Sequence, residues 1–304
     1  MKIFLAGGTG FLGGSLLKAL AYKADEIIVP SRRKREAHLQ NVRFIHADLT
    51  QKGEWEKELA GCDVVINFAG YPVYRPWTAK VKRLIWETRV DLTRNLVEAF
   101  GGCEGKMLIN ASAVGIYGDQ KEKTVTEETP SENENHFIVR LCRAWEEEAL
   151  KASPKQKVAV LRMGIVTGRG SHFERALSAI TRLKVAPILC SPNQWVSWID
   201  VGDFVRAVEF ILEKGGGGIY NMTSPNPLRQ KEFFSKLFGT KIHPRIPCAF
   251  LKLLGEQGEF FTWSQRAIPQ KLLNEGFEFS SYSNLCGQGA GGGGKEFEKL
   301  NAVS

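Results

Sequence analysis

The sequence contains no long apolar run. No stretch of its 304 residues approaches the roughly 20 uninterrupted apolar residues that a membrane-spanning helix needs. The N-terminal residues MKIFLAGG hold one lysine and a short apolar run broken by glycines, which is typical of a buried strand rather than a secretory signal peptide. We therefore expect a cytoplasmic protein that has no membrane partner.

Closely spaced cysteines are also missing. None of the six cysteines forms a C-x-x-C pair, and none has a histidine beside it at zinc-binding spacing. Reduced and mostly buried thiols are the simplest interpretation, and we expect no metal site. The cysteines are Cys62, Cys103, Cys142, Cys190, Cys248 and Cys286.

Dense clusters of charge are rare. The formal net charge is +8, but the basic residues are dispersed except in SRRKR at 31–35. Because nucleic-acid binding needs a basic patch or stripe, we expect no nucleic-acid partner. The hydrophobic content of 43% and the charged content of 24% are typical of a globular domain. We expect the excess positive charge to attract a phosphorylated small molecule.

Short apolar runs alternate with amphipathic helical patterns through the first half of the chain. The runs are rich in Val and Ile and are bounded by Gly, Asp or Asn, as buried parallel strands are. Helical patterns at 11–22, 80–100 and 137–151 lie between them. This alternation predicts an α/β fold with a doubly wound parallel sheet of the Rossmann type. The predicted strands are 2–6, 26–29, 42–45, 63–68, 106–111 and 158–163.

The pattern changes after residue 168. Helical segments dominate there, at 203–214, 230–238 and 264–274, and a strand-like piece occupies 218–223. This pattern predicts a smaller region that closes over the sheet. The predicted division is a Rossmann domain at 1–168, a mainly helical substrate-binding cap that partly completes the sheet at 169–285, and a Gly-rich disordered tail at 286–304.

The segment GGTGFLG at 7–13 follows the first predicted strand and opens the first predicted helix. In that position Gly7 permits a tight turn, Gly10 lets the backbone approach a pyrophosphate, and Gly13 lets the helix pack closely on the strand. The pyrophosphate then lies at the positive N-terminus of the helix. The segment predicts a dinucleotide site, with a glycine-rich turn that binds nothing as the alternative.

The end of the second strand selects the nucleotide. An acidic residue there binds the ribose 2′-hydroxyl of NAD, whereas this chain has Ser31, Arg32 and Arg33. A serine hydroxyl and guanidinium groups would bind a 2′-phosphate through charge-assisted hydrogen bonds. We therefore predict NADP as the cofactor and interpret Lys34 and Arg35 as part of a solvated basic loop.

Two further segments follow predicted strands. Asp48-Leu49 comes after the third strand, where an aspartate can accept a hydrogen bond from the adenine amino group. NFAG at 67–70 ends the fourth strand, where small residues would let the ribose and pyrophosphate pass close to the backbone. Both segments support a nucleotide at this edge of the sheet.

These motifs together resemble the extended short-chain dehydrogenase/reductase superfamily, whose markers also include SAVGIYG at 112–118. RMGIVTGRG at 162–170, SWIDVGD at 197–203 and QRAIPQKLL at 265–273 make the chain more similar to one atypical branch. That branch contains sugar-nucleotide epimerase-like oxidoreductases, some of which are described as cell-division-inhibitor-like. The similarity runs from the first residue to about residue 285.

The resemblance implies a Rossmann domain that binds NADP(H), with Phe68, Ala69, Arg89 and Val166 near the cofactor. Arg89 could reach the pyrophosphate or a ribose from the long helix, or it could be an ordinary surface arginine. Motifs and resemblance together predict these cofactor-binding residues: Gly7, Thr9, Gly10, Phe11, Leu12, Gly13, Ser31, Arg32, Arg33, Asp48, Leu49, Phe68, Ala69, Gly70, Arg89 and Val166.

One feature typical of the superfamily is missing. Its commonest members carry Tyr-x-x-x-Lys on a helix at about residues 137–146, the tyrosine being the general acid/base and the lysine lowering its pKa. Here that segment reads FIVRLCRAWE, and its only match with a basic fourth partner is Val139-x-x-x-Arg143. Val139 cannot donate a proton, and Arg143 could bind ribose hydroxyls but stays protonated. Ser112, Tyr117 and Arg143 are therefore the candidate catalytic residues.

Several of the remaining candidates have an equally simple structural interpretation. Tyr117 can pack in a Tyr-Gly turn, Trp198 can belong to the core, and Trp145-Glu146 fits a packed helix face with an internal ion pair. Further candidate proton donors are Tyr71, Tyr74 and His136, and candidates for a substrate pocket are Arg162, Trp198 and Asp200.

Two functions remain open. The leading hypothesis is an NADP(H)-dependent oxidoreductase or epimerase-like enzyme that acts on a small polar substrate, such as a sugar nucleotide, with an unusual proton donor. The alternative is an NADP(H)-binding regulatory protein that senses redox state and has little or no catalytic activity. The missing tyrosine and lysine favour the second, and the retained cleft residues favour the first. Helices at 79–100 and 137–151 could pair two copies into a homodimer.

Overall fold

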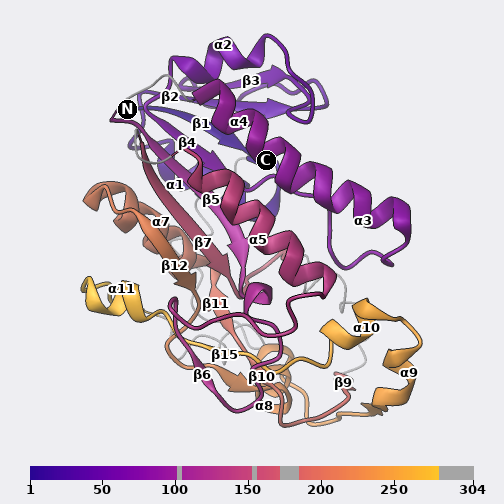
Figure 1. Cartoon of the computed structure of the whole chain (residues 1–304). Helices are drawn as coiled ribbons and strands as arrows, with labels where there is room; N and C mark the ends of the chain where they lie inside the picture. Colours follow the sequence, from indigo (N-terminus) through magenta and orange to yellow (C-terminus); the bar gives the residue numbers. More distant parts are fainter. Residues whose placement is uncertain (101–104, 153–155, 172–184, 281–304) are drawn as a thin grey trace.

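The computed structural model describes residues 1–100, 105–152, 156–171 and 185–280 (Figure 1). Its centre is a seven-stranded parallel sheet in the order β12-β7-β5-β4-β1-β2-β3. The strand order reverses next to β1, which is the topological switch point of a doubly wound sheet. The predicted Rossmann-type fold is confirmed. The strands are β1 (Lys2–Ala6), β2 (Glu26–Ser31), β3 (Val42–His46), β4 (Val64–Asn67), β5 (Met107–Ala113), β7 (Lys157–Met163) and β12 (Gly218–Met222).

Helices cover both faces of this sheet because its strands are apolar on both sides. In β1, Ile3 and Leu5 pack in the core cluster of α1 and α7, whereas Phe4 and Ala6 pack in the cluster of α2, α4 and α5. Figure 1 shows α4 and α5 side by side over one face. Within the described ranges, no helix has the length and apolar character that crossing a bilayer requires. The helices are α1 (Phe11–Leu20), α2 (Trp55–Ala60), α3 (Ala79–Trp86), α4 (Leu92–Phe100), α5 (Phe137–Leu150) and α7 (Val201–Lys214).

Residues from β8 onwards contribute to the central sheet and to a second region below it in Figure 1. The strand predicted at 218–223 is β12, which pairs in parallel with β7. The proposed domain boundaries themselves stay a prediction, and the tail at 286–304 lies outside the described residues. The elements of this region are β8 (Ile165–Thr167), β9 (Ile188–Leu189), β10 (Trp195–Val196), β11 (Trp198–Asp200), β13 (Leu228–Arg229), α8 (Gln230–Phe238), β14 (Arg245–Ile246), α9 (Cys248–Lys252) and α10 (Glu256–Phe260).

The helix predicted at 264–274 is wrong in its first half. Residues Arg266–Ala267 form strand β15, which pairs with β6 (Thr124–Val125), and only α11 (Gln270–Asn274) is helical. Pro269 has no amide hydrogen and disfavours a helical conformation in the residue before it, so a helix cannot run through this point. The amide of Ala267 instead donates to the hydroxyl of Ser197 at 2.9 Å.

The expectation of reduced thiols is wrong for two of the cysteines. Cys190, which follows β9, and Cys248, which begins α9, form a disulfide with their Cα atoms 4.4 Å apart. They are separated by 58 residues and come together because β9 and β14 pair in parallel just before each of them. Cys62 and Cys142 are free and buried, as expected.

Candidate cofactor and active site

The loop between β1 and α1 leaves room only for glycine at two positions. Gly7 has a φ of 81°, and a Cβ added there would lie 2.6 Å from the carbonyl carbon of Phe68. A Cβ on Gly13 would lie 2.3 Å from the carbonyl oxygen of Gly7. The first glycine therefore lets the loop touch the end of β4, and the second lets α1 touch the loop.

The N-terminus of α1 has no capping side chain. Its N-cap residue is Gly10, and its first turn contains no acidic residue. Thr9 and Gly10 are exposed, whereas Phe11 and Leu12 are half-buried. A Cβ on Gly168 would lie 3.3 Å from the ring of Phe11, so the chain that follows β8 adjoins this loop. Bare backbone amides at a helix N-terminus favour an anion.

The residues that end β2 form a local turn that carries two exposed arginines. The hydroxyl of Ser31 donates to the carbonyl of Arg33 at 2.8 Å and accepts from its amide at 3.2 Å. The carbonyl of Arg32 lies 3.2 Å from Nε2 of His46. The guanidinium groups of Arg32 and Arg33 have no hydrogen bond or ion pair within the described part of the chain. Both groups can therefore reach an anionic ligand.

The two residues after β3 differ in their surroundings. Asp48 is exposed, and its Oδ1 accepts hydrogen bonds from the amide of Thr50 at 3.0 Å and from its hydroxyl at 2.7 Å. Leu49 is buried in the core cluster of α2 and α4. The aspartate can still accept from a ligand, whereas the leucine side chain belongs to the core.

The residues that end β4 line the same edge of the sheet. The ring of Phe68 packs edge-on against that of Phe204, with centroids 5.3 Å apart. The amide of Ala69 donates to Oδ1 of Asn67 at 3.2 Å, which fixes the turn after the strand. Val166 is half-buried on β8, and it packs against the same core cluster as Phe68.

Arg89 lies on a π-helical turn, η1 (Glu87–Asp91), that joins α3 to α4. Its guanidinium donates to the carbonyl of Tyr71 at 2.9 Å and lies 5.3 Å from the ring centre of Trp145. A Cβ on Gly70 would lie 2.9 Å from its Cζ. No carboxylate contacts it among the described residues, and burial lowers its pKa. Arg89 is thus a half-buried cation without a counter-ion, which differs from an ordinary surface arginine.

A buried polar network occupies the other end of the same sheet edge. Arg162 on β7 donates from Nε and Nη2 to the two carboxylate oxygens of Glu146 on α5, at 2.9 and 2.8 Å. The hydroxyl of Ser112, on β5, donates to the same carboxylate at 2.6 Å. Nη1 of Arg162 donates to the hydroxyl of Tyr117 at 2.9 Å. Two candidate catalytic residues, Ser112 and Tyr117, are therefore linked through this ion pair.

Tyr117 is fully buried, with its ring in an apolar cluster and its hydroxyl in the polar network. It belongs to the 3-10 turn η2 (Val114–Tyr117) and has no exposed surface. Its hydroxyl donates to Oδ1 of Asn221 at 2.7 Å, and burial raises its pKa to about 12. Lys121 stands four residues later but is exposed, in a turn with a φ of 53°. This pair has the sequence spacing of Tyr-x-x-x-Lys without its helical geometry.

The helix α5 contains neither tyrosine nor lysine. Val139 is buried among apolar side chains. Arg143 points away from the network and forms an ion pair with Glu134 at 2.5 Å, its side chain being 38% exposed. The structure therefore does not bring Arg143 together with Ser112 and Tyr117.

Three of the remaining candidates have structural roles. His136 caps α5: it accepts from the amide of Ile138 at 3.3 Å, and its Nε2 lies 2.9 Å from the carbonyl of Glu256. Trp198 is buried in the core cluster of α8. Asp200 caps the N-terminus of α7, and burial raises its pKa.

The tyrosines that follow β4 remain open as proton donors. Tyr71 is half-buried, and its amide donates to the hydroxyl of Thr88 at 2.8 Å. Its own hydroxyl makes no hydrogen bond within the described ranges. Tyr74 is 44% exposed and lies 6.0 Å from the guanidinium of Arg75. Tyr71 is therefore the better-enclosed of the two.

Two members of the network were not predicted from the sequence. Asn221, on β12, donates from Nδ2 to the carbonyl of Ile268 at 2.9 Å. Glu127 accepts from the amides of Asn221 at 3.0 Å and Lys271 at 3.2 Å. An asparagine inside the apolar run GIYNM signals a buried hydrogen-bond partner. The loop position of Glu127 gives no such signal.

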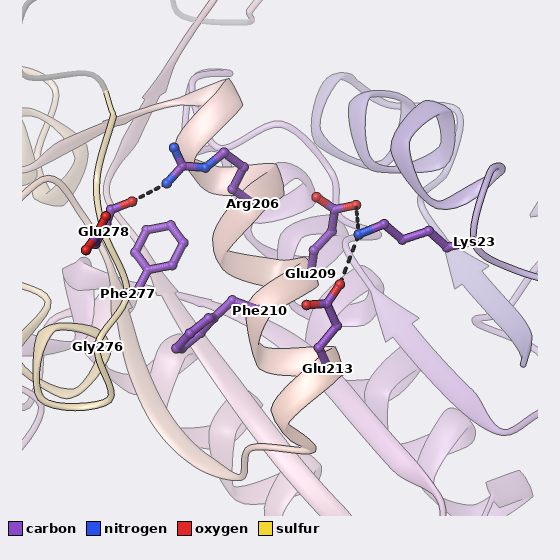
Figure 2. A pocket seen from close by; sticks show the side chains of 8 residues that line it. All are labelled: Lys23, Arg206, Glu209, Phe210, Glu213, Gly276, Phe277 and Glu278. Atoms are coloured by element: carbon purple, nitrogen blue, oxygen red, sulfur yellow. Dashed lines mark hydrogen bonds and ion pairs between the residues drawn. The ribbon is translucent and has the colours of Figure 1, made fainter.

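A separate pocket lies on the outer face of α7 (Figure 2). Its two cationic side chains are engaged within the chain: Nζ of Lys23 lies 3.0 Å from a carboxylate oxygen of Glu209 and of Glu213, and Arg206 donates to the backbone carbonyl of Glu278. None of the predicted site residues lines it, so we assign the cofactor elsewhere. The lining residues are Lys23, Arg206, Glu209, Phe210, Glu213, Gly276, Phe277 and Glu278.

Two known proteins are similar to this chain over nearly its whole length. Epimerase family protein YfhF of Bacillus subtilis is 33% identical over 293 residues, which cover 94% of this chain and 95% of that protein. Epimerase family protein SDR39U1 homolog, chloroplastic, of Arabidopsis thaliana is 30% identical over 292 residues, which cover 92% of this chain and 83% of that protein. Both similarities extend well beyond the glycine-rich loop.

Two solved structures share the fold. Human epimerase family protein SDR39U1 (isoform2), crystallised with NADPH, has a TM-score of 0.79 at 22% identity and covers 94% of this chain and 97% of its own. MoeE5 in complex with UDP-glucuronic acid and NAD has a TM-score of 0.71 at 18% identity and covers 96% and 95%. Residues 3–223 match the NAD dependent epimerase/dehydratase family. The chain therefore belongs to that family, as an atypical extended short-chain dehydrogenase/reductase.

Proposed function

We propose that the chain binds NADP(H) at the carboxyl ends of β1, β2 and β4 and uses it in an oxidoreductase or epimerase-like reaction. The observation that supports this most is a set of positive groups without carboxylate partners at one sheet edge. They are the uncapped start of α1, the exposed Arg32 and Arg33, and the half-buried Arg89. A dinucleotide that carries a 2′-phosphate is the anion that would satisfy all of them.

The residues of this edge fit such a group. Gly7 and Gly13 bring the loop, the end of β4 and α1 into backbone contact. A Cβ on Gly10 would meet only the carbonyl oxygen of Gly7, at 3.3 Å, so the outer side of the loop is bare backbone. We assign the pyrophosphate to this loop and to Arg89, and the 2′-phosphate to Ser31, Arg32 and Arg33.

The nicotinamide would supply hydride transfer to a carbonyl carbon or from a carbinol carbon of the substrate. Reduction then takes up a proton and oxidation releases one, and we propose that a side chain of this protein exchanges it. Tyr117 is enclosed with its pKa raised to about 12, so it is a poor donor at neutral pH. We propose Tyr71 instead, because Arg89 and Thr88 hold its backbone while its hydroxyl is unengaged among the described residues.

We propose a small polar substrate, with a sugar nucleotide as the first class to test. The support is the shared fold with MoeE5, whose structure is a complex with UDP-glucuronic acid and NAD. A homodimer through α3, α4 and α5 and a cytoplasmic location stay predictions.

A regulatory protein that binds NADP(H) and does not turn over is the second candidate. The observation that favours it is the composition of α5, which lacks tyrosine and lysine, together with the burial of Tyr117. Both candidates require the same cofactor site, so they differ only in whether a proton donor faces the substrate.

The cofactor assignment is tested by exchanging the two arginines after β2. We expect the double variant Arg32→Asp, Arg33→Ala to lose roughly a hundredfold or more in NADPH affinity, because two charge-assisted hydrogen bonds of about 1.5–3 kcal/mol each are removed. NADH affinity should be unchanged or higher. The matched control is Arg35→Ala, which removes a neighbouring exposed charge. Titration of the protein's tryptophan fluorescence with each nucleotide gives both affinities, and an unchanged NADPH affinity would refute the assignment.

A measurement of catalytic turnover distinguishes the enzyme hypothesis from the regulatory-protein hypothesis. Native protein and Tyr71→Phe are compared for substrate-dependent loss of NADPH absorbance over a panel of sugar nucleotides and carbonyl compounds. The enzyme hypothesis predicts turnover that Tyr71→Phe lowers by about a hundredfold, the contribution of a positioned general acid. NADPH binding without turnover on any panel member would favour the regulatory protein.

A further inference from the structure

Three large apolar side chains are exposed together at the end of α9. They are Phe250 at 64%, Leu253 at 82% and Leu254 at 55% exposure, and we name them the apolar corner. The other exposed large apolar residues in the described ranges are isolated from one another along the sequence. Scattered exposed apolar residues are normal, whereas a cluster of this kind marks a surface that meets an apolar partner.

The base beneath the apolar corner is tightly fixed. A Cβ on Gly258 would lie 1.7 Å from the carbonyl oxygen of Leu251, so α9 and α10 touch through their backbones. The disulfide from Cys248 joins the start of α9 to the end of β9. Glu256, at the start of α10, forms an ion pair with Lys82 of α3. The corner therefore projects from a rigid support.

Basic side chains border the apolar corner. Lys252 lies between its members and is exposed, and Arg245 is exposed next to the disulfide, with its Nε 2.6 Å from the carbonyl of Cys190. Arg75 is exposed beside α10, where its carbonyl accepts from Gln257 at 3.0 Å. Glu259 is an exposed acid nearby, whereas the charge of Glu256 is neutralised by Lys82.

We infer that the apolar corner is a docking site for an anionic phospholipid surface. The three side chains are more than half exposed and follow closely in sequence, and apolar groups of this kind can insert at the boundary between headgroups and acyl chains without a matching pocket. The basic border and the net charge of +8 favour an anionic surface and oppose docking of a second copy of the chain. Figure 1 shows α9 and α10 at one extremity of the molecule, away from the central sheet.

This inference departs from the expectation of no membrane partner. The sequence gives no transmembrane signal because the apolar side chains belong to the seven-residue stretch CAFLKLL, which is far too short to span a bilayer. Interfacial docking needs only a few side chains that reach the boundary between headgroups and acyl chains. The inference does not depend on the proposed cofactor.

The test is sedimentation of the full chain with sucrose-loaded vesicles. We expect binding to vesicles of phosphatidylcholine mixed with phosphatidylglycerol, weaker binding to phosphatidylcholine alone, and loss of binding as salt is raised. Leu253→Gln with Leu254→Gln should weaken binding roughly tenfold or more, because two leucines no longer insert. Lys252→Ala should weaken it roughly fivefold, as expected for one lost cation near an anionic surface.

The matched control is Leu150→Gln with Leu273→Gln, which alters two leucines of about 40% exposure on other helices. This control should bind vesicles as the native chain does. Equal unfolding temperatures and NADPH affinities for all variants would show that only the surface has changed. No binding of the native chain to the anionic vesicles, or equal binding of the corner variant and the control, would overturn the inference. So would a native dimer that the corner variant dissociates, because the corner would then serve a second copy.

Discussion

The charged side chains at the two ends of the sheet's carboxyl edge differ in whether they have partners within the chain. At β1, β2 and β4, the arginines Arg32, Arg33 and Arg89 contact no carboxylate among the described residues. At β5, β7 and β12, the ion pair of Arg162 and Glu146 is buried and surrounded by hydrogen bonds. Positive groups left unpaired are suited to an external anion, whereas groups paired internally hold the fold together.

This contrast separates binding from stability on a single sheet. Changes at the paired end should lower the free energy of unfolding and leave nucleotide affinity intact. Changes at the unpaired end should lower nucleotide affinity and leave the free energy of unfolding nearly unchanged. The segment SAVGIYG resembles a catalytic motif in sequence. In the structure, however, its serine donates a hydrogen bond to Glu146 and its tyrosine accepts one from Arg162.

The largest effect is expected from breaking the buried ion pair. Arg162→Met leaves the carboxylate of Glu146 buried without its partner, which should lower the free energy of unfolding by about 3–5 kcal/mol. Adding Glu146→Gln to this variant should recover part of the loss, because no buried charge then remains. Chemical denaturation monitored by circular dichroism gives the values.

The control for this pair is the exposed ion pair between Arg143 on α5 and Glu134, which precedes that helix. Arg143→Ala removes the contact with Glu134 and should cost about 0–1 kcal/mol, as exposed ion pairs do. The contrast between the two ends fails if Arg162→Met costs no more than Arg143→Ala, or if it abolishes NADPH binding while the fold is intact.

An intermediate effect is expected from the pH dependence of Tyr117. Burial raises its pKa from 10.0 to about 12, so the folded protein holds the phenolic proton more tightly than the unfolded chain does. This contribution is present below about pH 10 and is lost as the pH rises towards about 12. A shift of two units corresponds to about 3 kcal/mol. The difference in unfolding free energy between native protein and Tyr117→Phe should therefore shrink across this range.

Denaturant unfolding of both proteins at several pH values from neutral upwards measures that difference. Other tyrosines, cysteines and lysines titrate in both proteins, so their contributions cancel in the comparison. Curves for the two proteins that stay parallel up to pH 11 would mean that the hydroxyl of Tyr117 reaches solvent, and its exclusion as a proton donor would then be withdrawn.

The fold could be predicted because its determinants are local in sequence. Buried parallel strands appear as short runs of Val and Ile, and all six predicted strands occur in the sheet with ends shifted by no more than two residues. The glycines of the loop could be predicted for the same reason, since a positive φ at Gly7 and the contact of Gly13 are local requirements.

The pairings could not be predicted because their partners come from distant segments. Glu146 and Arg162 lie on a helix and a strand, and nothing in either segment specifies the other. The sequence gives no sign that Cys190 and Cys248 are joined, because only the pairing of β9 with β14 brings them together. The sequence does not decide the role of Arg89 either, since burial and the absence of a carboxylate neighbour are properties of the folded chain.

Substitution of Arg89 should have the smallest effect on the free energy of unfolding, but it tests most directly whether the unpaired end binds the nucleotide. Arg89→Met keeps the length of the side chain and removes a half-buried charge that has no counter-ion, at the cost of its hydrogen bond to Tyr71. These changes oppose each other, so the free energy of unfolding should move by less than about 1 kcal/mol. NADPH affinity should fall about tenfold, because the pyrophosphate loses one charge-assisted hydrogen bond. Arg89→Lys should recover part of that affinity, since it restores the charge without the planar group. A loss of stability as large as that of Arg162→Met, with unchanged affinity, would place Arg89 with the paired end and erase the difference between the two.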